Sequence, residues 1–321
     1  MFDALGVTFL ASRMTRGVPV LAYHGVTSRP DDPLRNRRRL HLSAETFSRH
    51  LQLLVREWHP IGLEAFLAGV RDGRPLPRRA VVVTFDDGYR NMQTVAAPLL
   101  RRFEVPFALF VVTGHVGGRL WIDRLEAAIE TTGRRRIAWR GLDLPLDSLV
   151  ERAGATETLV RVLRPLGPER VPVLKELLDQ LGGESDATDE DRDLLTWDEI
   201  RQVREAGADI GCHADVHERL TDRSAEEVAL GLEGSRRTLA EKLGKGSYTF
   251  CYPYGAWDAA RASSVRQAGF EAAFTTDGGR NRPGADPYCL RRCLVGADDD
   301  IPRLRASLSG LRALLQRGLG Q

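Results

Sequence analysis

The sequence predicts an α/β protein in which strands and helices alternate around a barrel. Short apolar runs alternate with amphipathic segments of helical period along most of the 321 residues. The apolar run at 80–83 is followed within four residues by two carboxylates, and the run at 208–212 is followed directly by a histidine. Functional residues at the carboxyl ends of strands in repeated βα units are the layout of a barrel enzyme.

The elements follow from these patterns in chain order. The run at 18–22 predicts a strand, and 43–58 predicts an amphipathic helix with Phe47, Leu51, Leu54 and Val55 on its apolar face. Ser224 and Glu227 form a capping box at the start of a later helix. We expect further strands at 80–83, 107–112, 208–212, 248–252 and 271–275, and further helices at 91–103, 224–243, 257–268 and 302–317.

One large domain with an insertion suits this length better than two independent domains. We expect an N-terminal segment at 1–17, a barrel at 18–300 with an insertion at 117–196, and a C-terminal helix at 301–321. The insertion carries charged helical patterns and is expected to cap the active-site face. At its start, Trp121-Ile122-Asp123 either helps to shape a substrate groove or lies in a packed surface helix, and the sequence favours the surface helix.

Two adjacent carboxylates follow the strand at 80–83, in the segment Thr84-Phe85-Asp86-Asp87-Gly88. Like charges this close are unfavourable unless a cation, a donor network or a proton offsets them. Gly88 lets the backbone turn away or approach a ligand closely. The alternative is a polar turn, because Asp-Gly is a common turn dipeptide.

A second cluster follows the strand at 208–212, in the segment His213-Ala214-Asp215-Val216-His217. Two histidines four residues apart can face one side of a helical turn and bind one metal. Chance pairing is the alternative, since the chain has 7 His. One carboxylate of the Asp86-Asp87 pair would complete a site of two histidines and one carboxylate, with open positions for water and substrate. The other carboxylate would then be free to act as a base.

Together these motifs resemble those of the polysaccharide deacetylases, the NodB-homology family or carbohydrate esterase family 4, from about residue 18 to 295. The resemblance implies a distorted barrel of about seven strands. The family motif T-F-D-D-G is matched in full, which implies that Asp86 is the general base and Asp87 a metal ligand. The motif H-[ST]-x-x-H implies that His213 and His217 are the other ligands. Ala214 replaces its hydroxyl residue, and we expect this change to loosen the loop.

The segment Phe250-Cys251-Tyr252-Pro253-Tyr254-Gly255 is similar to the third family motif, R-x-P-Y-G or F-x-Y-P-Y-G. The resemblance implies that the backbone N–H of Tyr254 stabilises an oxyanion. Cys251 stands where many members have the arginine that orients the base, so the sequence assigns the base no partner. The alternative for this segment is a strand that ends in a Pro-Tyr-Gly turn.

The general acid is a histidine in this family, within an L-x-H motif near the C-terminus. Here the matching stretch is Leu290-Arg291-Arg292, which has no histidine. One branch, which includes biofilm exopolysaccharide deacetylases, has its acid histidine in an N-terminal L-x-Y-H segment, and Leu21-Ala22-Tyr23-His24 matches it. The resemblance therefore implies that His24 is the general acid, against the alternative of ordinary barrel lining. His115 is a weaker substitute, and His41, His50 and His59 are expected at the surface or at helix ends.

The resemblance implies a metal-dependent hydrolase that removes N-acetyl groups from an amino-sugar-containing glycan or glycan precursor and releases acetate. Imidazole ligands suit zinc and its neighbours, so we expect a divalent metal, Zn²⁺ first, with Co²⁺, Ni²⁺ or Mn²⁺ as alternatives. Two other functions stay open. One is a catalytically silent carbohydrate-binding relative, and the other is a metal hydrolase of another small amide.

Composition restricts the partners. The net charge is +2, and no dominant basic face supports nucleic-acid binding. The arginine-rich run at 35–39 is either a solvated loop or a contact for an anionic substrate. The four cysteines do not form a secreted disulfide framework, so we expect free thiols in a reducing compartment.

The N-terminal residues 1–11 are mildly apolar but lack a basic region, and Asp3 lies where positive charge would be expected in a signal peptide. No run of about 18 apolar residues predicts a transmembrane helix. We therefore expect a cytoplasmic protein, with peripheral contact at the inner membrane left open. Its substrate would be a lipid-linked or nucleotide-linked sugar or a nascent N-acetylated glycan.

Overall fold

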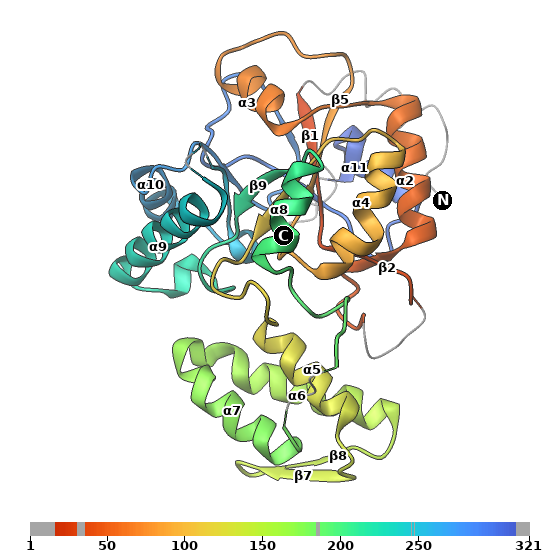
Figure 1. Cartoon of the computed structure of the whole chain (residues 1–321), viewed down its shortest axis with the longest axis vertical. Coiled ribbons are helices and arrows are strands. Elements are labelled where there is room, and N and C mark those ends of the chain that lie inside the picture. The colour runs from red at the N-terminus through yellow and green to blue at the C-terminus, as the bar shows by residue number, and fades with distance from the viewer. Residues whose placement is uncertain (1–16, 31–35, 184–186, 245, 247, 313–321) are drawn as a thin grey trace.

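The computed structural model describes residues 17–30, 36–183, 187–244, 246 and 248–312. A curved sheet with helices around it forms the main body, and a smaller helical lobe projects from one side (Figure 1). Residues 1–16 of the predicted N-terminal segment 1–17 and residues 313–321 of the predicted C-terminal helix lie outside the described residues.

The central sheet has the strand order β11-β10-β9-β6-β5-β1, and every neighbouring pair in it is parallel. Strand β13 (Cys293–Leu294) pairs in parallel with β1, and Leu290 forms a parallel bridge to Phe274 of β11. The segment 290–294 thus contacts both ends of the curved sheet. These seven strands confirm the predicted distorted barrel. The bounds are β1 (Val18–Tyr23), β5 (Ala80–Phe85), β6 (Phe107–Val111), β9 (Asp209–Cys212), β10 (Phe250–Cys251) and β11 (Ala273–Phe274).

Continuous apolar runs form the central strands because both faces of the sheet are covered. Every residue of β1, β5 and β6 is buried, as expected for parallel strands between helices. Two short strands extend the sheet: β12 (Arg280–Asn281) pairs antiparallel with β1, and β4 (His59–Pro60) pairs parallel with β5. A separate parallel pair joins β2 (Gly25–Thr27) and β3 (His41–Ser43).

The predicted helices are present with shorter ends. The capping box of Ser224 and Glu227 starts α9 as predicted. Two expectations for the first helix are wrong: Val55 is 44% exposed, whereas His50 is fully buried and replaces it on the inner face. The helices of the main body are α2 (Ala44–Glu57), α3 (Leu63–Arg71), a π-helical turn (Met92–Ala96) that continues into α4 (Ala97–Arg102), α8 (Trp197–Glu205), α9 (Ala225–Leu243), α10 (Ala259–Gln267) and α11 (Ile301–Ser309).

The projecting lobe comes from the predicted insertion and has an apolar core of its own (Figure 1). It is tied to the barrel directly beside the two aspartates. The N–H of Leu195 donates to the carbonyl of Gly88 at 2.9 Å, and Leu194 bridges to Tyr89. The end of the insertion therefore lies against the loop that carries Asp86 and Asp87, and Gly117 at its start donates to the Leu195 carbonyl at 2.9 Å. Its elements are α5 (Trp121–Thr131), β7 (Arg136–Trp139), β8 (Leu142–Pro145), α6 (Leu149–Leu163), a 3-10 turn (Arg164–Glu169) and α7 (Arg170–Leu181).

The arginine-rich run joins the barrel to the insertion. Arg38 forms an ion pair with Asp123 of α5, and Arg37 donates to the carbonyl of Ala153 at 2.6 Å. Arg39 pairs with Asp298. Arg37 and Arg38 therefore act neither as part of a solvated loop nor as a contact for an anionic substrate, because both make contacts within the protein. Arg35 lies outside the described residues.

The four cysteines have free thiols, as predicted. Within the described ranges, no helix combines the length and apolar character needed to cross a membrane.

Buried His50 makes the stability of the fold depend on pH. Its ring nitrogens contact the Tyr23 hydroxyl at 3.2 Å and the Asp299 carbonyl at 2.8 Å, and burial lowers its pKa to about 4. Because the unfolded state regains a histidine pKa near 6.5, it binds more protons than the folded state between these values. The contribution of neutral His50 to the free energy of unfolding is therefore complete above the unfolded pKa and is lost as the pH falls towards 4.

We expect His50 to make the free energy of unfolding about 2 kcal/mol smaller at pH 5 than at pH 7. Urea denaturation of the protein and of His50→Gln at both pH values measures this difference. The variant should lose this contribution of about 2 kcal/mol, while other buried histidines, such as His41, whose pKa burial lowers to about 3, keep theirs. An equal dependence in both proteins would contradict the assignment.

Candidate active site and metal centre

The carboxyl ends of four parallel strands bring the predicted residues together. In the β1–β5 register Tyr23 lies opposite Phe85, so His24 and Asp86 emerge side by side. The N–H of Asp86 donates to the Tyr23 carbonyl at 2.9 Å. Strand β9 ends in Cys212, whose partner Phe250 starts the strand that leads to Cys251. Parallel pairing therefore collects all three motifs at one edge of the sheet.

Asp87, His213 and His217 form a compact group of metal-ligand type. Oδ1 of Asp87 lies 3.4 Å from Nε2 of His213 and 3.3 Å from Nε2 of His217. One ligand atom of each of the three residues lies within 4.8 Å of the other two. This is the two-histidine, one-carboxylate set predicted from the sequence.

The residues of this group fit a divalent cation. Burial alone would raise the pKa of the Asp87 carboxyl, but the neighbouring imidazoles hold it well below its usual range. Its Oδ1 is buried and accepts no hydrogen bond within the described part of the chain. Nδ1 of His213 lies 2.8 Å from the Cys251 carbonyl, which can only accept, so Nδ1 is the protonated nitrogen and Nε2 is free for a metal.

The loop that carries the histidines is not the helical turn that we expected from their spacing. Residues 213–219 form an irregular bend, with Ala214 at φ +66°. The loop that follows β6 holds this bend: Thr113 and Gly114 donate backbone hydrogen bonds to the carbonyls of Ala214 and Asp215 at 3.0 and 2.9 Å. Arg223 pairs with the Asp215 carboxylate at 2.7 Å. These contacts fix the loop without the hydroxyl that Ala214 lacks.

Three of the seven non-glycine residues with positive φ in the described part of the chain lie at the site. Asp87, Ala214 and Tyr254 all have positive φ, at +70°, +66° and +57°. Non-glycine residues in this region cost about 1–3 kcal/mol each and persist where the surrounding structure enforces them. All three lie in the predicted motifs, which is typical of a functional site.

Asp86 has a partner that the sequence did not reveal. Arg292 donates to both of its carboxylate oxygens at 2.7 Å, and both side chains are buried. Burial raises the pKa of Asp86, but the guanidinium outweighs it and the pKa lies below its usual value. Cys251, at the motif position of the missing arginine, lies 2.8 Å from Nη2 of Arg292. The arginine is therefore supplied from the residue before β13.

His24 lies among these groups but has no fixed partner. Its Nδ1 is buried without a hydrogen bond in the described residues. Burial lowers its pKa, while the charges of Asp87 and Asp86 act in the opposite direction. An unpartnered imidazole beside two carboxylates is available to a ligand.

Tyr254 borders the metal-type group from the third motif. It lies in a 3-10 turn (Pro253–Gly255), and its ring packs on that of His217 with centroids 4.6 Å apart. The side chain is 42% exposed, so Tyr254 forms part of the wall that faces solvent.

The family sequence model described as polysaccharide deacetylase matches residues 73–273. The chain belongs to the polysaccharide deacetylase family. Over 66 residues, 21% of this chain, it is 38% identical to the poly-beta-1,6-N-acetyl-D-glucosamine N-deacetylase of Escherichia coli K12. That match spans only 9% of the length of the curated relative.

Two solved structures share the fold of this polysaccharide deacetylase. The Streptococcus pyogenes deacetylase PplD, in complex with acetate, aligns with a TM-score of 0.62 and 15% identity, over 91% of this chain and 98% of that one. IcaB from Ammonifex degensii aligns with a TM-score of 0.61 and 21% identity, over 92% and 98%. At these identities the likeness establishes the fold alone.

The other histidines of the polysaccharide deacetylase lie away from the group or are structural. His115 lines a different cavity, beside Arg90 and Arg119. His41 is buried and contacts the side chain of Asn91 at 3.1 Å, so its predicted surface position is wrong, as it is for His50. His59 is exposed, as predicted. His24 is therefore the candidate acid that adjoins Asp86.

A cavity of about 740 Å³ opens from the metal-type group of the polysaccharide deacetylase towards the insertion. His217 and Tyr254 form one end, and Trp121 belongs to the insertion side. Both alternatives for this segment describe part of Trp121, which packs in the apolar core of the insertion and also lines the cavity, whereas Asp123 is fully buried and not at the surface. Asp123 accepts a hydrogen bond from the Tyr89 hydroxyl at 2.9 Å, which ties α5 to the aspartate loop.

The role of Arg292 was not predicted from the sequence, because the C-terminal family motif calls for a histidine and assigns no role to an arginine. One local signal was present. Leu290, Arg292 and Leu294 share one parity of an extended segment, so an arginine stands among apolar positions of a strand. A buried arginine at such a position needs a carboxylate partner, and Asp86 supplies it.

Proposed function

We propose that the protein is a metal-dependent hydrolase that removes the N-acetyl group from an amino sugar of a glycan or glycan precursor and releases acetate. One observation carries this proposal: two adjacent aspartates have separate environments. Asp87 adjoins the imidazoles of His213 and His217, whereas Asp86 is paired with Arg292. These separate environments support the assignment of Asp87 as a metal ligand and Asp86 as the general base.

Asp87, His213 and His217 would hold a divalent cation, with Zn²⁺ as the first choice. When bound, such a metal polarises the acetamide carbonyl and lowers the pKa of a coordinated water. The remaining work falls to side chains of the protein. Asp86 accepts the proton of the attacking water, and its ion pair with Arg292 keeps it ionised and oriented.

Tyr254 and His24 would complete the reaction. The backbone N–H of Tyr254 donates to the oxyanion of the tetrahedral intermediate. His24 gives a proton to the sugar nitrogen as the carbon–nitrogen bond breaks, because an amide nitrogen is a poor leaving group. A cytoplasmic location, which the sequence predicts, favours a lipid-linked or nucleotide-linked precursor as the substrate.

The proposal is tested by acetate release from N-acetylglucosamine oligomers by metal-reconstituted protein. We expect metal-dependent release, and we expect His24→Ala to lower kcat by about a hundredfold or more. His115→Ala serves as the matched control, since His115 lines another cavity. No release from any acetylated sugar, with one equivalent of metal bound, would point to a different amide or to a binding protein. Equal losses in both variants would remove His24 from its role.

A further inference from the structure

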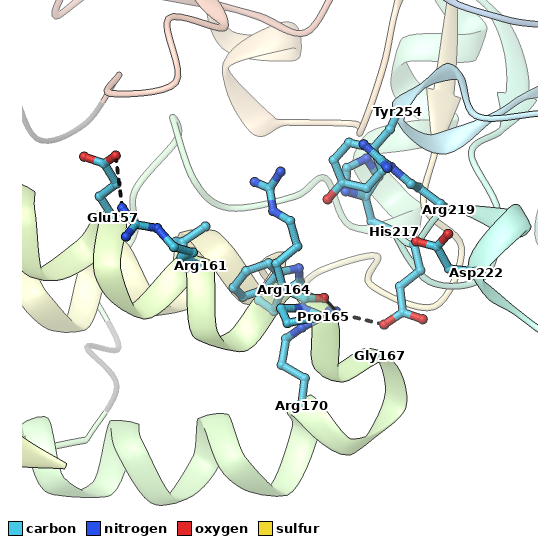
Figure 2. A pocket seen from close by; sticks show the side chains of 13 residues that line it. Glu157, Arg161, Arg164, Pro165, Gly167, Arg170, His217, Arg219, Asp222 and Tyr254 are labelled. Atoms are coloured by element: carbon cyan, nitrogen blue, oxygen red, sulfur yellow. Dashed lines mark hydrogen bonds and ion pairs between the residues drawn. The ribbon is translucent and has the colours of Figure 1, made fainter. Parts of the chain in front are cut away.

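The cavity beside the metal-type group is lined by arginines from two directions. Arg161, Arg164 and Arg170 belong to the insertion, and Arg219 follows the histidine loop of the barrel. In Figure 2 the insertion side chains rise from one wall, while His217, Arg219 and Tyr254 lie across the cavity. The volume of about 740 Å³ is that of a site for a molecule larger than one sugar.

Two of these arginines already have carboxylate partners. Arg161 pairs with Glu157 at 3.7 Å on the same helix. Arg170 pairs with Glu218 at 3.2 Å, donates to the carbonyls of Leu163 and Arg164, and lies 4.4 Å from the centroid of the Trp121 ring. The charge of Arg161 is therefore paired within α6, and the charge of Arg170 links the insertion to the histidine loop of the barrel.

The other two guanidinium groups remain available to a ligand. Among the described residues, neither Arg164 nor Arg219 forms an ion pair. The Arg164 side chain reaches into the space that Tyr254 faces (Figure 2), and its charge opposes the rise that burial causes in the pKa of Tyr254. Arg219 lies over the Tyr254 ring, 5.7 Å from the centroid.

One carboxylate lines the same cavity without an ion pair in the described residues. Asp222 accepts a hydrogen bond from the Thr221 hydroxyl at 3.3 Å, close to the barrel end. After the paired groups are set aside, positive charge still exceeds negative charge on the lining. The cavity therefore favours an anion, with Asp222 available to sugar hydroxyls.

We propose that this cavity binds the phosphate or diphosphate group of the substrate, so that the deacetylated molecule is an N-acetylamino sugar carried on a phosphate. This inference rests on the proposed function and names its substrate class. Arginine binds phosphate oxygens through two parallel hydrogen bonds. Two guanidinium groups from opposite walls suit the adjacent charges of a diphosphate better than a single carboxylate. Nucleotide-linked and lipid-linked sugars share this chemistry.

The charge of the product supports the same choice. Deacetylation turns a neutral acetamide into an amine that is protonated at neutral pH. A polymer that is already partly deacetylated would place ammonium groups near Arg164 and Arg219, and like charges repel. A single phosphorylated sugar avoids this repulsion, and its anionic end remains attracted while the new ammonium group leaves.

Binding is measured first, by calorimetry on the metal-loaded Asp86→Asn protein, which should not turn over the ligand. We expect uridine-diphosphate N-acetylglucosamine to bind at least about tenfold more tightly than the neutral N-acetylglucosamine trimer, and added salt to reduce that preference. Arg164→Gln should remove most of the preference, and Arg164→Lys should restore part of it. Arg136→Gln is the charge-matched control, since Arg136 is 64% exposed in β7 and pairs with Asp143. An equal loss in this control, or no preference in the parent protein, would overturn the inference.

Acetate release separates this inference from the proposed function. The active protein is given the neutral trimer, the nucleotide-linked sugar and N-acetylglucosamine linked through diphosphate to a short prenyl chain. The inference is supported if kcat/KM is higher for one of the diphosphate substrates than for the trimer, and if this ratio falls about tenfold in Arg164→Gln. The preferred diphosphate then identifies the carrier. Release from the trimer without any preference keeps the proposed function and overturns the phosphate site. No release from any of the three overturns the proposed function, whatever the binding shows.

Discussion

Asp86→Asn should lower acetate release by about a thousandfold while the protein still binds one equivalent of metal. The reason is the separation of the two aspartates. The Asp86 carboxylate accepts two hydrogen bonds from Arg292, whereas the ligand group consists of Asp87, His213 and His217. Asparagine keeps one oxygen for Arg292 but cannot take a proton from water, and a general base contributes about a hundred- to ten-thousandfold.

The matched comparison is Asp87→Asn, one residue further along the chain. This variant should lose the metal on dialysis, and with it the activity, because one of three ligands is weakened. Metal analysis and kcat measured on both variants make the test. If Asp86→Asn loses the metal and Asp87→Asn keeps it, the two roles are exchanged. If Asp86→Asn keeps more than about a tenth of the activity, Asp86 is not the base.

Arg292→Gln should have the second largest effect, on both stability and the pH dependence of catalysis. It leaves the buried Asp86 carboxylate without a counter-charge, which costs about 3–5 kcal/mol of unfolding free energy. Burial then raises the pKa of Asp86 with only the weaker opposing charges of His213 and His24 beside it. The acidic limb of kcat/KM should therefore move to higher pH, since the base must be deprotonated to act.

Moving the charge back to the position that many family members use gives a control for this prediction. Cys251 Sγ lies 2.8 Å from Arg292 Nη2, so the two side chains share one space. The double variant Cys251→Arg/Arg292→Cys should recover part of the stability and return the acidic limb towards its original pH. An unchanged pH profile in Arg292→Gln would show that Arg292 does not set the basicity of Asp86.

The sequence predicted the ligand-type residues because each motif is local. Asp86 and Asp87 are adjacent in the chain, and His213 and His217 lie four residues apart after a strand. Parallel pairing then needs only the strand order to bring them to one edge. The central strands could also be predicted from the sequence, since both of their faces are buried and they form continuous apolar runs.

Pairings between distant residues could not be predicted in this way. Arg292 and Asp86 are 206 positions apart, and they meet only because β13 pairs with β1 beside β5. The burial of His50 is another example. Helical spacing could not show that His50 and not Val55 lies on the inner face, because this depends on contacts with Tyr23 and Asp299. The helical turn expected for His213 and His217 does not form, because Ala214 adopts a positive φ and the loop after β6 donates hydrogen bonds to the carbonyls of Ala214 and Asp215.

The sequence by itself determined the fold class, the family resemblance and the set of residues that could carry the chemistry. Only the tertiary structure decided that Arg292 replaces the missing arginine, that Trp121 and Asp123 are buried, and that the insertion forms a wall of the site. The physical reason is that short motifs and strand periodicity are local properties of the chain. The partner of a buried charge is set by which segments the sheet brings together.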